Sequence, residues 1–156
     1  MSNAAPPVFF FTFADPDQQS TVALPSLQQE EASIRAALAS GEQTGSWEFL
    51  SGFHACRASL FETFRNNRVA IFHFGGHSNQ KSLWLPAETP GNQIVDGTLL
   101  EEFLASQPSL QLAFFNSCEN QDWAARVASR VPFVIASVAK LDDAIAGHFA
   151  TPDDLD

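Results

Sequence analysis

The segment Val69-Ala70-Ile71-Phe72-His73-Phe74-Gly75-Gly76-His77-Ser78 decides the fold that we expect. Its first part is an almost wholly apolar run, which is typical of a strand buried on both faces of a parallel sheet. A second segment, Leu110-Gln111-Leu112-Ala113-Phe114-Phe115-Asn116-Ser117-Cys118-Glu119-Asn120, is built in the same way. The first run stops at His77 and the second at Cys118. Because the carboxyl ends of neighbouring parallel strands share one edge of a sheet, we expect these two side chains to meet there.

The rest of the chain alternates between apolar runs and apolar residues at helical spacing. Strands are predicted at 7–13, 47–50, 69–74, 82–85, 110–115 and 133–137, and helices at 26–39, 55–65, 98–105, 122–129 and 141–150. Gly41 follows the first helix as a stop signal. This alternation indicates parallel βαβ units with right-handed crossovers. We therefore predict an α/β fold, a three-layer α/β/α sandwich with a mostly parallel sheet.

Length and composition limit the class of protein. At 156 residues the chain fits one domain, which we place at residues 8–150 with flexible termini at 1–7 and 151–156. The last predicted helix ends soon after it begins, which we interpret as a fragment of a longer protein. No apolar run approaches the roughly 20 residues of a membrane span, and no signal peptide is visible. The two cysteines are too few for a disulfide framework, so we predict a cytoplasmic protein with free thiols.

The formal net charge is −10, from 18 acidic and 8 basic residues. A negative field opposes the phosphate backbone, so we do not expect nucleic-acid binding. We interpret the acidic residues as a solvated surface rather than as a site for basic substrates. The sequence shows no cluster of metal ligands and no glycine-rich nucleotide-binding motif, so we predict neither a metal nor another cofactor.

A thiol and an imidazole at one sheet edge indicate nucleophilic catalysis. The imidazole of His77 has an unperturbed pKa near neutrality, which makes it a suitable base for a thiol. Cys118 lies on a predicted strand-to-helix turn, where helix amides and an imidazole lower a thiol pKa. Gly75 and Gly76 allow the tight backbone geometry that presents His77. His73 lies inside the apolar run and is interpreted as a core histidine; His54 and His148 have weaker contexts.

The two motifs, "FHFGGHSN" and "AFFNSCEN", resemble the histidine and cysteine motifs of the CHAT family, caspase-like cysteine peptidases related to separases and metacaspases. In that family an apolar strand ends in Gly-His, and a later strand ends in Asn-x-Cys followed by an acidic residue. The segments 130–137 and 141–144 also resemble the family's next strand and helix start, and "PPVFFFTFADPD" resembles its opening strand. The resemblance covers roughly residues 8–150. It implies a caspase-like fold within a large multidomain bacterial protein.

The resemblance assigns roles to individual residues. It implies His77 as the general base, Cys118 as the nucleophile, and an oxyanion hole from backbone amides near Ser78 and Cys118. The residue after the histidine is often glycine in related peptidases, and here it is Ser78. Metacaspase-like enzymes have an aspartate two residues before the nucleophile that binds a basic P1 side chain; here that position is Asn116. Asn116 and three loop carboxylates are the residues proposed to border the substrate pocket: Asp15, Asp142 and Asp143.

The expected function is therefore a cysteine endopeptidase that acts on a polypeptide substrate. By the same resemblance, regulatory domains of a larger protein would control it, and an oligomer is compatible with the family. One alternative is a catalytically silent caspase-like module used for sensing or docking, because a fold alone does not fix function. A receiver-like or flavodoxin-like domain shares the alternating pattern, and would use Asp15 and Asp17 as an acidic pocket.

Overall fold

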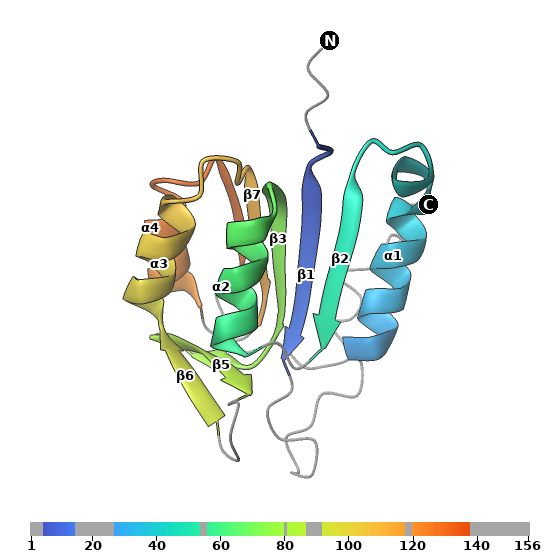
Figure 1. Ribbon diagram of the computed structural model, residues 1–156. Coiled ribbons are helices and arrows are strands. Elements are labelled where there is room, and N and C mark those ends of the chain that lie inside the picture. Colours follow the sequence, from blue (N-terminus) through green and yellow to red (C-terminus); the bar gives the residue numbers. More distant parts are fainter. Residues whose placement is uncertain are drawn as a thin grey trace, which may run out of the picture.

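Five parallel strands form the central sheet of the computed structural model (Figure 1). The structure describes residues 5–14, 27–53, 56–79, 81–86, 92–117 and 120–137. The strands, in their order across the sheet, are β2 (Glu48–Phe53), β1 (Val8–Ala14), β3 (Val69–Gly76), β7 (Leu112–Asn116) and β8 (Phe133–Ala136). All four neighbouring pairs are parallel, as the alternating pattern predicted. β3 is the central strand, with β1 on one side and β7 on the other.

Helices cover both faces of this sheet. α1 (Leu27–Gln43) packs on one face against the odd-numbered phenylalanines of β1, such as Phe11 and Phe13. The opposite face carries α2 (Arg57–Asn66), α3 (Gly97–Ala105) and α4 (Gln121–Val127). Residues of these three helices share one apolar cluster with Phe72, Phe74 and Phe115 of the sheet. The result is the three-layer α/β/α sandwich expected from the sequence.

A second, smaller sheet is inserted between β3 and α3. It contains β4 (Ser78–Asn79), β5 (Ser82–Pro86) and β6 (Asn92–Asp96), all antiparallel. The short strand predicted at 82–85 is β5, but β6 was not predicted. Its sequence, Asn92-Gln93-Ile94-Val95-Asp96, has only two apolar residues, which is too few to show the pattern of a strand.

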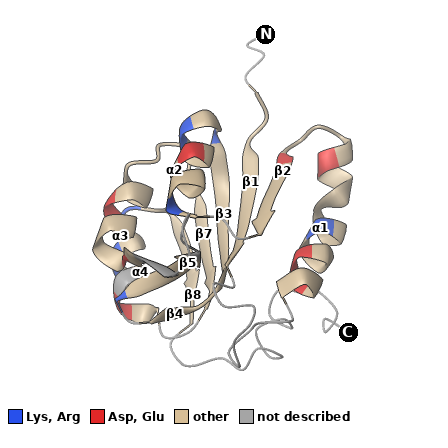
Figure 2. Ribbon diagram, turned by 60° about the horizontal axis from the view of Figure 1, so that its bottom comes forward, with Lys and Arg blue, Asp and Glu red and all other residues tan. Residues whose placement is uncertain are grey.

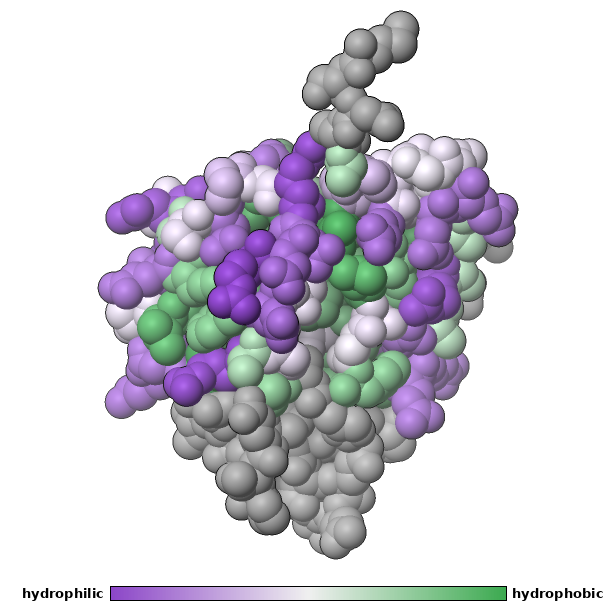
Figure 3. Space-filling view, in the orientation of Figure 1, coloured by the Kyte–Doolittle hydropathy of each residue, from purple (hydrophilic) through white to green (hydrophobic). Residues whose placement is uncertain are grey.

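Phenylalanine rings fill much of the main core. The chain has 15 phenylalanines and no tyrosine. Phe72 of β3 is fully buried, and its ring lies 5.8 Å from that of Phe10 and 5.3 Å from that of Phe64. Among the described residues, most of the charged ones lie in the helices, while β1, β3, β7 and β8 contain no Lys, Arg, Asp or Glu (Figure 2). Figure 3 shows a mainly hydrophilic surface with hydrophobic areas, one of them around α3, where Leu99 is exposed.

The prediction that Gly41 ends the first helix was wrong. α1 continues to Gln43, and Gly41 lies inside it. A Cβ atom at Gly41 would collide with the indole ring of Trp47, which packs directly on the helix backbone. The chain turns later, at Gly45, whose φ of +68° lies in the left-handed region. Gly41 therefore does not end the helix; it allows the ring of Trp47 to pack against the helix backbone.

Asp96 caps the N-terminus of α3 and offers a test of local stability. Its carboxylate accepts hydrogen bonds from the backbone amides of Thr98 at 2.8 Å and Leu99 at 3.4 Å. These bonds lower the pKa of Asp96 below its ordinary value of 3.8. We expect Asp96→Ala to lower the melting temperature by a few degrees at pH 7, since the cap is lost. Because the folded pKa is lowered, the wild-type advantage should persist above pH 3.8 and vanish as the pH falls further below it.

The matched control is Asp96→Asn, which keeps a capping oxygen but cannot titrate in this range. Thermal melts of the three proteins between pH 3 and pH 7 measure the effect. An equal gap between wild type and Asp96→Ala at every pH would show that the carboxylate charge contributes nothing.

Candidate functional site

β3 and β7 are neighbours, and both end at the same edge of the sheet. Their register pairs Gly75 with Asn116 as its last match. His77 follows the end of β3 directly, and Cys118 comes two residues after Asn116. Cys118 itself lies outside the described residues. The structure thus places the two strand ends side by side, as the sequence predicted, and the contact between His77 and Cys118 stays a prediction.

The backbone directly before His77 passes very close to β1. A Cβ atom at Gly76 would collide with the carbonyl oxygen of Ala14, and its φ of +157° is one that other residues rarely adopt. A Cβ atom at Gly75 would lie 3.0 Å from the ring of Phe13. Glycine is therefore required at position 76, while at position 75 a larger residue would have to displace the ring of Phe13.

His77 stands where the central sheet gives way to the small one. Its side chain is half-buried, and its ring lies 6.1 Å from the ring of Trp84. The backbone nitrogen of Trp84 donates a 3.0 Å hydrogen bond to the carbonyl oxygen of His77. The turn that follows is closed by Asn79, whose side-chain oxygen accepts hydrogen bonds from the backbone nitrogens of Lys81 and Ser82. Hydrogen bonds to the small sheet thus hold the backbone at His77 in place.

The remaining predicted site residues are distributed as follows. Ser78, expected to contribute an oxyanion-hole amide, lies in β4, opposite Leu83 of β5. Asn116 is described and only 4% exposed. Asp15, Asp142 and Asp143 lie outside the described residues, as do His54, His148 and the helix predicted at 141–150.

The side chain of Asn120 bonds back to the end of β7, a contact that the sequence analysis missed. Its side chain is fully buried, and its Nδ2 lies 3.2 Å from the carbonyl oxygen of Phe115 and 3.0 Å from that of Ser117. The same Nδ2 lies 2.9 Å from the Ser117 hydroxyl oxygen. One amide group thus ties Asn120 to the last residues of β7 and to Ser117 directly after it. Asparagine just before a predicted helix start was the available signal, because its side chain often bonds nearby backbone groups.

A buried carboxyl group beneath the strand ends was also missed. Glu30 of α1 is only 1% exposed, and its Oε1 accepts a 2.8 Å hydrogen bond from the Nδ2 of Asn116. The Nε2 of His73 lies 3.0 Å from the same oxygen. Neither ring nitrogen of His73 has a well-directed hydrogen bond, so this is a close polar contact away from the N–H axis. His73 is thus the buried core histidine that the apolar run predicted.

Comparison with known proteins gives a relative by structure alone. No protein-family model matches the chain, and no curated protein matches it in sequence. Among solved structures it is similar to a secreted C11 cysteine protease from Bacteroides thetaiotaomicron, in complex with an irreversible peptide inhibitor. The TM-score is 0.62 at 10% sequence identity, over 88% of this chain. The chain shares its fold with part of this protease.

The likeness confirms the predicted caspase-like α/β class. At 10% identity it shows the fold and not the activity. The chain spans about 50% of the length of that structure. The narrower assignment to the CHAT family rests on the sequence resemblance and is not shown by this likeness.

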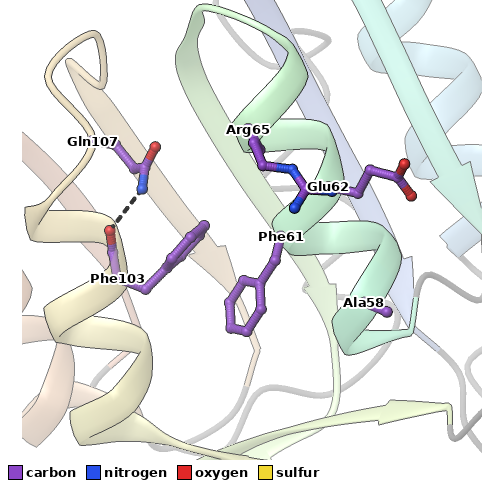
Figure 4. A pocket seen from close by; sticks show the side chains of 6 residues that line it. All are labelled: Ala58, Phe61, Glu62, Arg65, Phe103 and Gln107. Carbon is purple, nitrogen blue, oxygen red and sulfur yellow. Dashed lines mark hydrogen bonds between the residues drawn. The ribbon is translucent and has the colours of Figure 1, made fainter.

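Other features of the described residues lie away from this edge. A pocket of about 660 Å³ opens between α2 and α3 (Figure 4), lined by Ala58, Phe61, Glu62, Arg65, Phe103 and Gln107. It includes none of the predicted site residues. Within the described ranges, no three histidine, cysteine, aspartate or glutamate side chains gather as metal ligands would. Among the described helices, none combines the length and apolar composition needed to cross a membrane.

Proposed function

We propose that this protein is a cysteine endopeptidase whose catalytic residues are His77 and Cys118. The observation that carries the proposal is the pairing of β3 with β7, since these are the strands that the two residues follow. The strand pair belongs to a fold that is shared with a cysteine protease. Ligands of parallel α/β sheets bind at the carboxyl edge of the strands. β3 ends one residue before His77 and β7 ends two residues before Cys118 in the sequence.

The chemistry follows from the two groups. The imidazole of His77 takes the proton of the Cys118 thiol, and the thiolate sulfur attacks the carbonyl carbon of a peptide bond. The tetrahedral intermediate collapses to a thioester when the C–N bond breaks, and the imidazolium returns its proton to the departing amine. A water molecule, deprotonated by His77, then attacks the thioester, which releases the carboxylic acid and the free thiol. The proposed steps use only the two side chains and water.

The surroundings of the dyad are assigned by the same proposal. Backbone amides of Ser78 and Cys118 would stabilise the oxyanion of the tetrahedral intermediate. Asn116, whose amide is already bonded to Glu30, would form part of the pocket floor. Asp15, Asp142 and Asp143 would border the same pocket. Asn116 is neutral, so it provides no opposite charge for a basic P1 side chain.

The wider setting is also part of the proposal. The motif resemblance supports membership of the CHAT family, in a bacterial protein whose further domains regulate the peptidase. A cytoplasmic location remains a prediction from cysteine usage. The structural neighbour is itself a secreted protease, so the fold is compatible with either location.

The pH dependence of Cys118 alkylation by iodoacetamide tests the dyad. We expect Cys118 to react well below pH 8.5, the ordinary range of a free thiol, because a neighbouring imidazole stabilises the thiolate. At pH 6.5, His77→Ala should lower this rate by about 10-fold or more. Mass spectrometry of the two cysteine-containing peptides measures the reaction, and Cys56 serves as the internal reference. Should Cys118 react like an ordinary or buried thiol in both proteins, the silent caspase-like module becomes the better assignment.

A further inference from the structure

Glu30 is a buried acidic residue that the proposed chemistry does not use. A carboxyl group this deeply buried loses its hydration. Proteins tolerate this cost only where other groups compensate for it. Surface positions were available on the same helix, since its neighbour Gln29 is exposed. The position of Glu30 therefore calls for an explanation from its contacts.

The contacts of Glu30 join the two strands that lead to the dyad. Oε1 lies 2.8 Å from Nδ2 of Asn116 on β7 and 3.0 Å from Nε2 of His73 on β3. Its other oxygen, Oε2, would lie 3.4 Å from a Cβ atom built at Gly75. Gly75 and Asn116 are the last matched pair of the two strands. The carboxylate therefore lies over the final rung of the β3–β7 ladder.

Only short stretches of chain separate this rung from the reactive side chains. His77 is two residues beyond Gly75, and Cys118 is two residues beyond Asn116. A shift of Gly75 relative to Asn116 would therefore change the relative positions of His77 and Cys118. Misplacement of reacting groups by about 1 Å can cost about 100-fold in rate.

We propose that Glu30 is a positioning residue, which clamps the ends of β3 and β7 and so sets the distance between His77 and Cys118. The inference rests on the proposed peptidase function and adds a residue of α1 to it. Glu30 acts through Asn116 and His73 and does not touch the substrate. The clamp also explains why Asn116 turns its amide into the protein.

The test compares variants at a temperature where each is folded. Glu30→Ala removes the acceptor for Asn116, while Glu30→Gln keeps an oxygen that can accept the same hydrogen bond. Ile34→Ala is the matched control, since Ile34 is buried one turn further along the same helix, in the cluster of Phe11 and Phe49, and its apolar side chain offers no hydrogen bond to β3 or β7. Circular dichroism melts confirm folding before each measurement.

The decisive readout is the pH profile of Cys118 alkylation by iodoacetamide. We expect Glu30→Ala to lower the rate at pH 6.5 by about 10-fold and to move the profile toward that of an ordinary thiol. Glu30→Gln should restore most of the rate, and Ile34→Ala should leave the profile unchanged. A purely structural role predicts instead the same profile for every folded variant.

The outcomes separate the two proposals. If wild type shows reactivity that depends on His77 and Glu30→Ala keeps it, the clamp is overturned and the peptidase proposal stands. If wild-type Cys118 shows no dependence on His77, the proposed function fails and the inference built on it fails too. If Ile34→Ala moves the profile as much as Glu30→Ala, general loosening of α1 is the cause and the clamp is again overturned.

Discussion

Replacement of Cys118 by serine is expected to reduce peptidase activity to the background of the assay, a loss of at least about 10³-fold. A serine hydroxyl beside the same imidazole is a far weaker acid than a thiol, so the nucleophile forms too rarely to sustain turnover. His77→Ala should cost about 10³-fold, within the range known for loss of a general base. Release of fluorophore from a pool of peptide substrates with varied P1 residues measures both losses.

Cys56→Ser is the control for general effects of losing a cysteine. Cys56 precedes α2, and its sulfur contacts the Ser59 hydroxyl at 3.6 Å, in a helix that carries neither dyad residue. Its replacement should leave activity within about twofold of wild type. Equal losses in Cys56→Ser and Cys118→Ser would contradict the assignment of the nucleophile. The double variant of His77 and Cys118 should be no less active than Cys118→Ser, since residues that act as a unit are not additive.

The main strands and their parallel arrangement could be predicted from the hydrophobic pattern, whereas the order of the strands across the sheet was not predicted. β1, β3 and β7 are short apolar runs that stop at polar residues, and such runs predict buried parallel strands without any knowledge of the partner. The prediction that β3 and β7 meet with their ends side by side followed from this pattern and was confirmed. β6 was not predicted, because only two of its five residues are apolar.

The buried polar contacts could not be anticipated in the same way. Glu30 stands in a helix among exposed Gln29 and other polar residues, and its sequence context does not distinguish it from a solvated acid. Its partner Asn116 is 86 residues away in the chain. A hydrogen bond at that separation depends on which face of β7 meets α1, and only the three-dimensional register settles that. Trp47 and Gly41 give the same lesson, since a glycine that ends a helix and one that admits a ring look alike in sequence.

Truncation of Phe72 to alanine should be the most damaging single change to stability. The ring is fully buried in the central strand, where it contacts the rings of Phe10, Phe64 and Phe115 at centroid distances of 5.8, 5.3 and 6.1 Å. Its removal leaves a cavity between the sheet and α2 that these rigid rings cannot close. We expect the free energy of unfolding to fall by about 3 to 5 kcal/mol. For a chain of this size, that corresponds to a drop in melting temperature of about 10 °C or more.

Phe133→Ala is the matched control, because it removes the same side chain from a place where it is 67% exposed on β8. Its cost should stay near or below about 0.5 kcal/mol, as for other surface substitutions. Urea unfolding followed by tryptophan fluorescence measures both variants, and an unchanged m-value shows that stability alone has changed. Equal costs for the two variants would mean that the rings around Phe72 relax into the space it leaves. In that case the clamp of β3 against β7 by Glu30 would rest on a flexible sheet, and the dyad would need another source of rigidity.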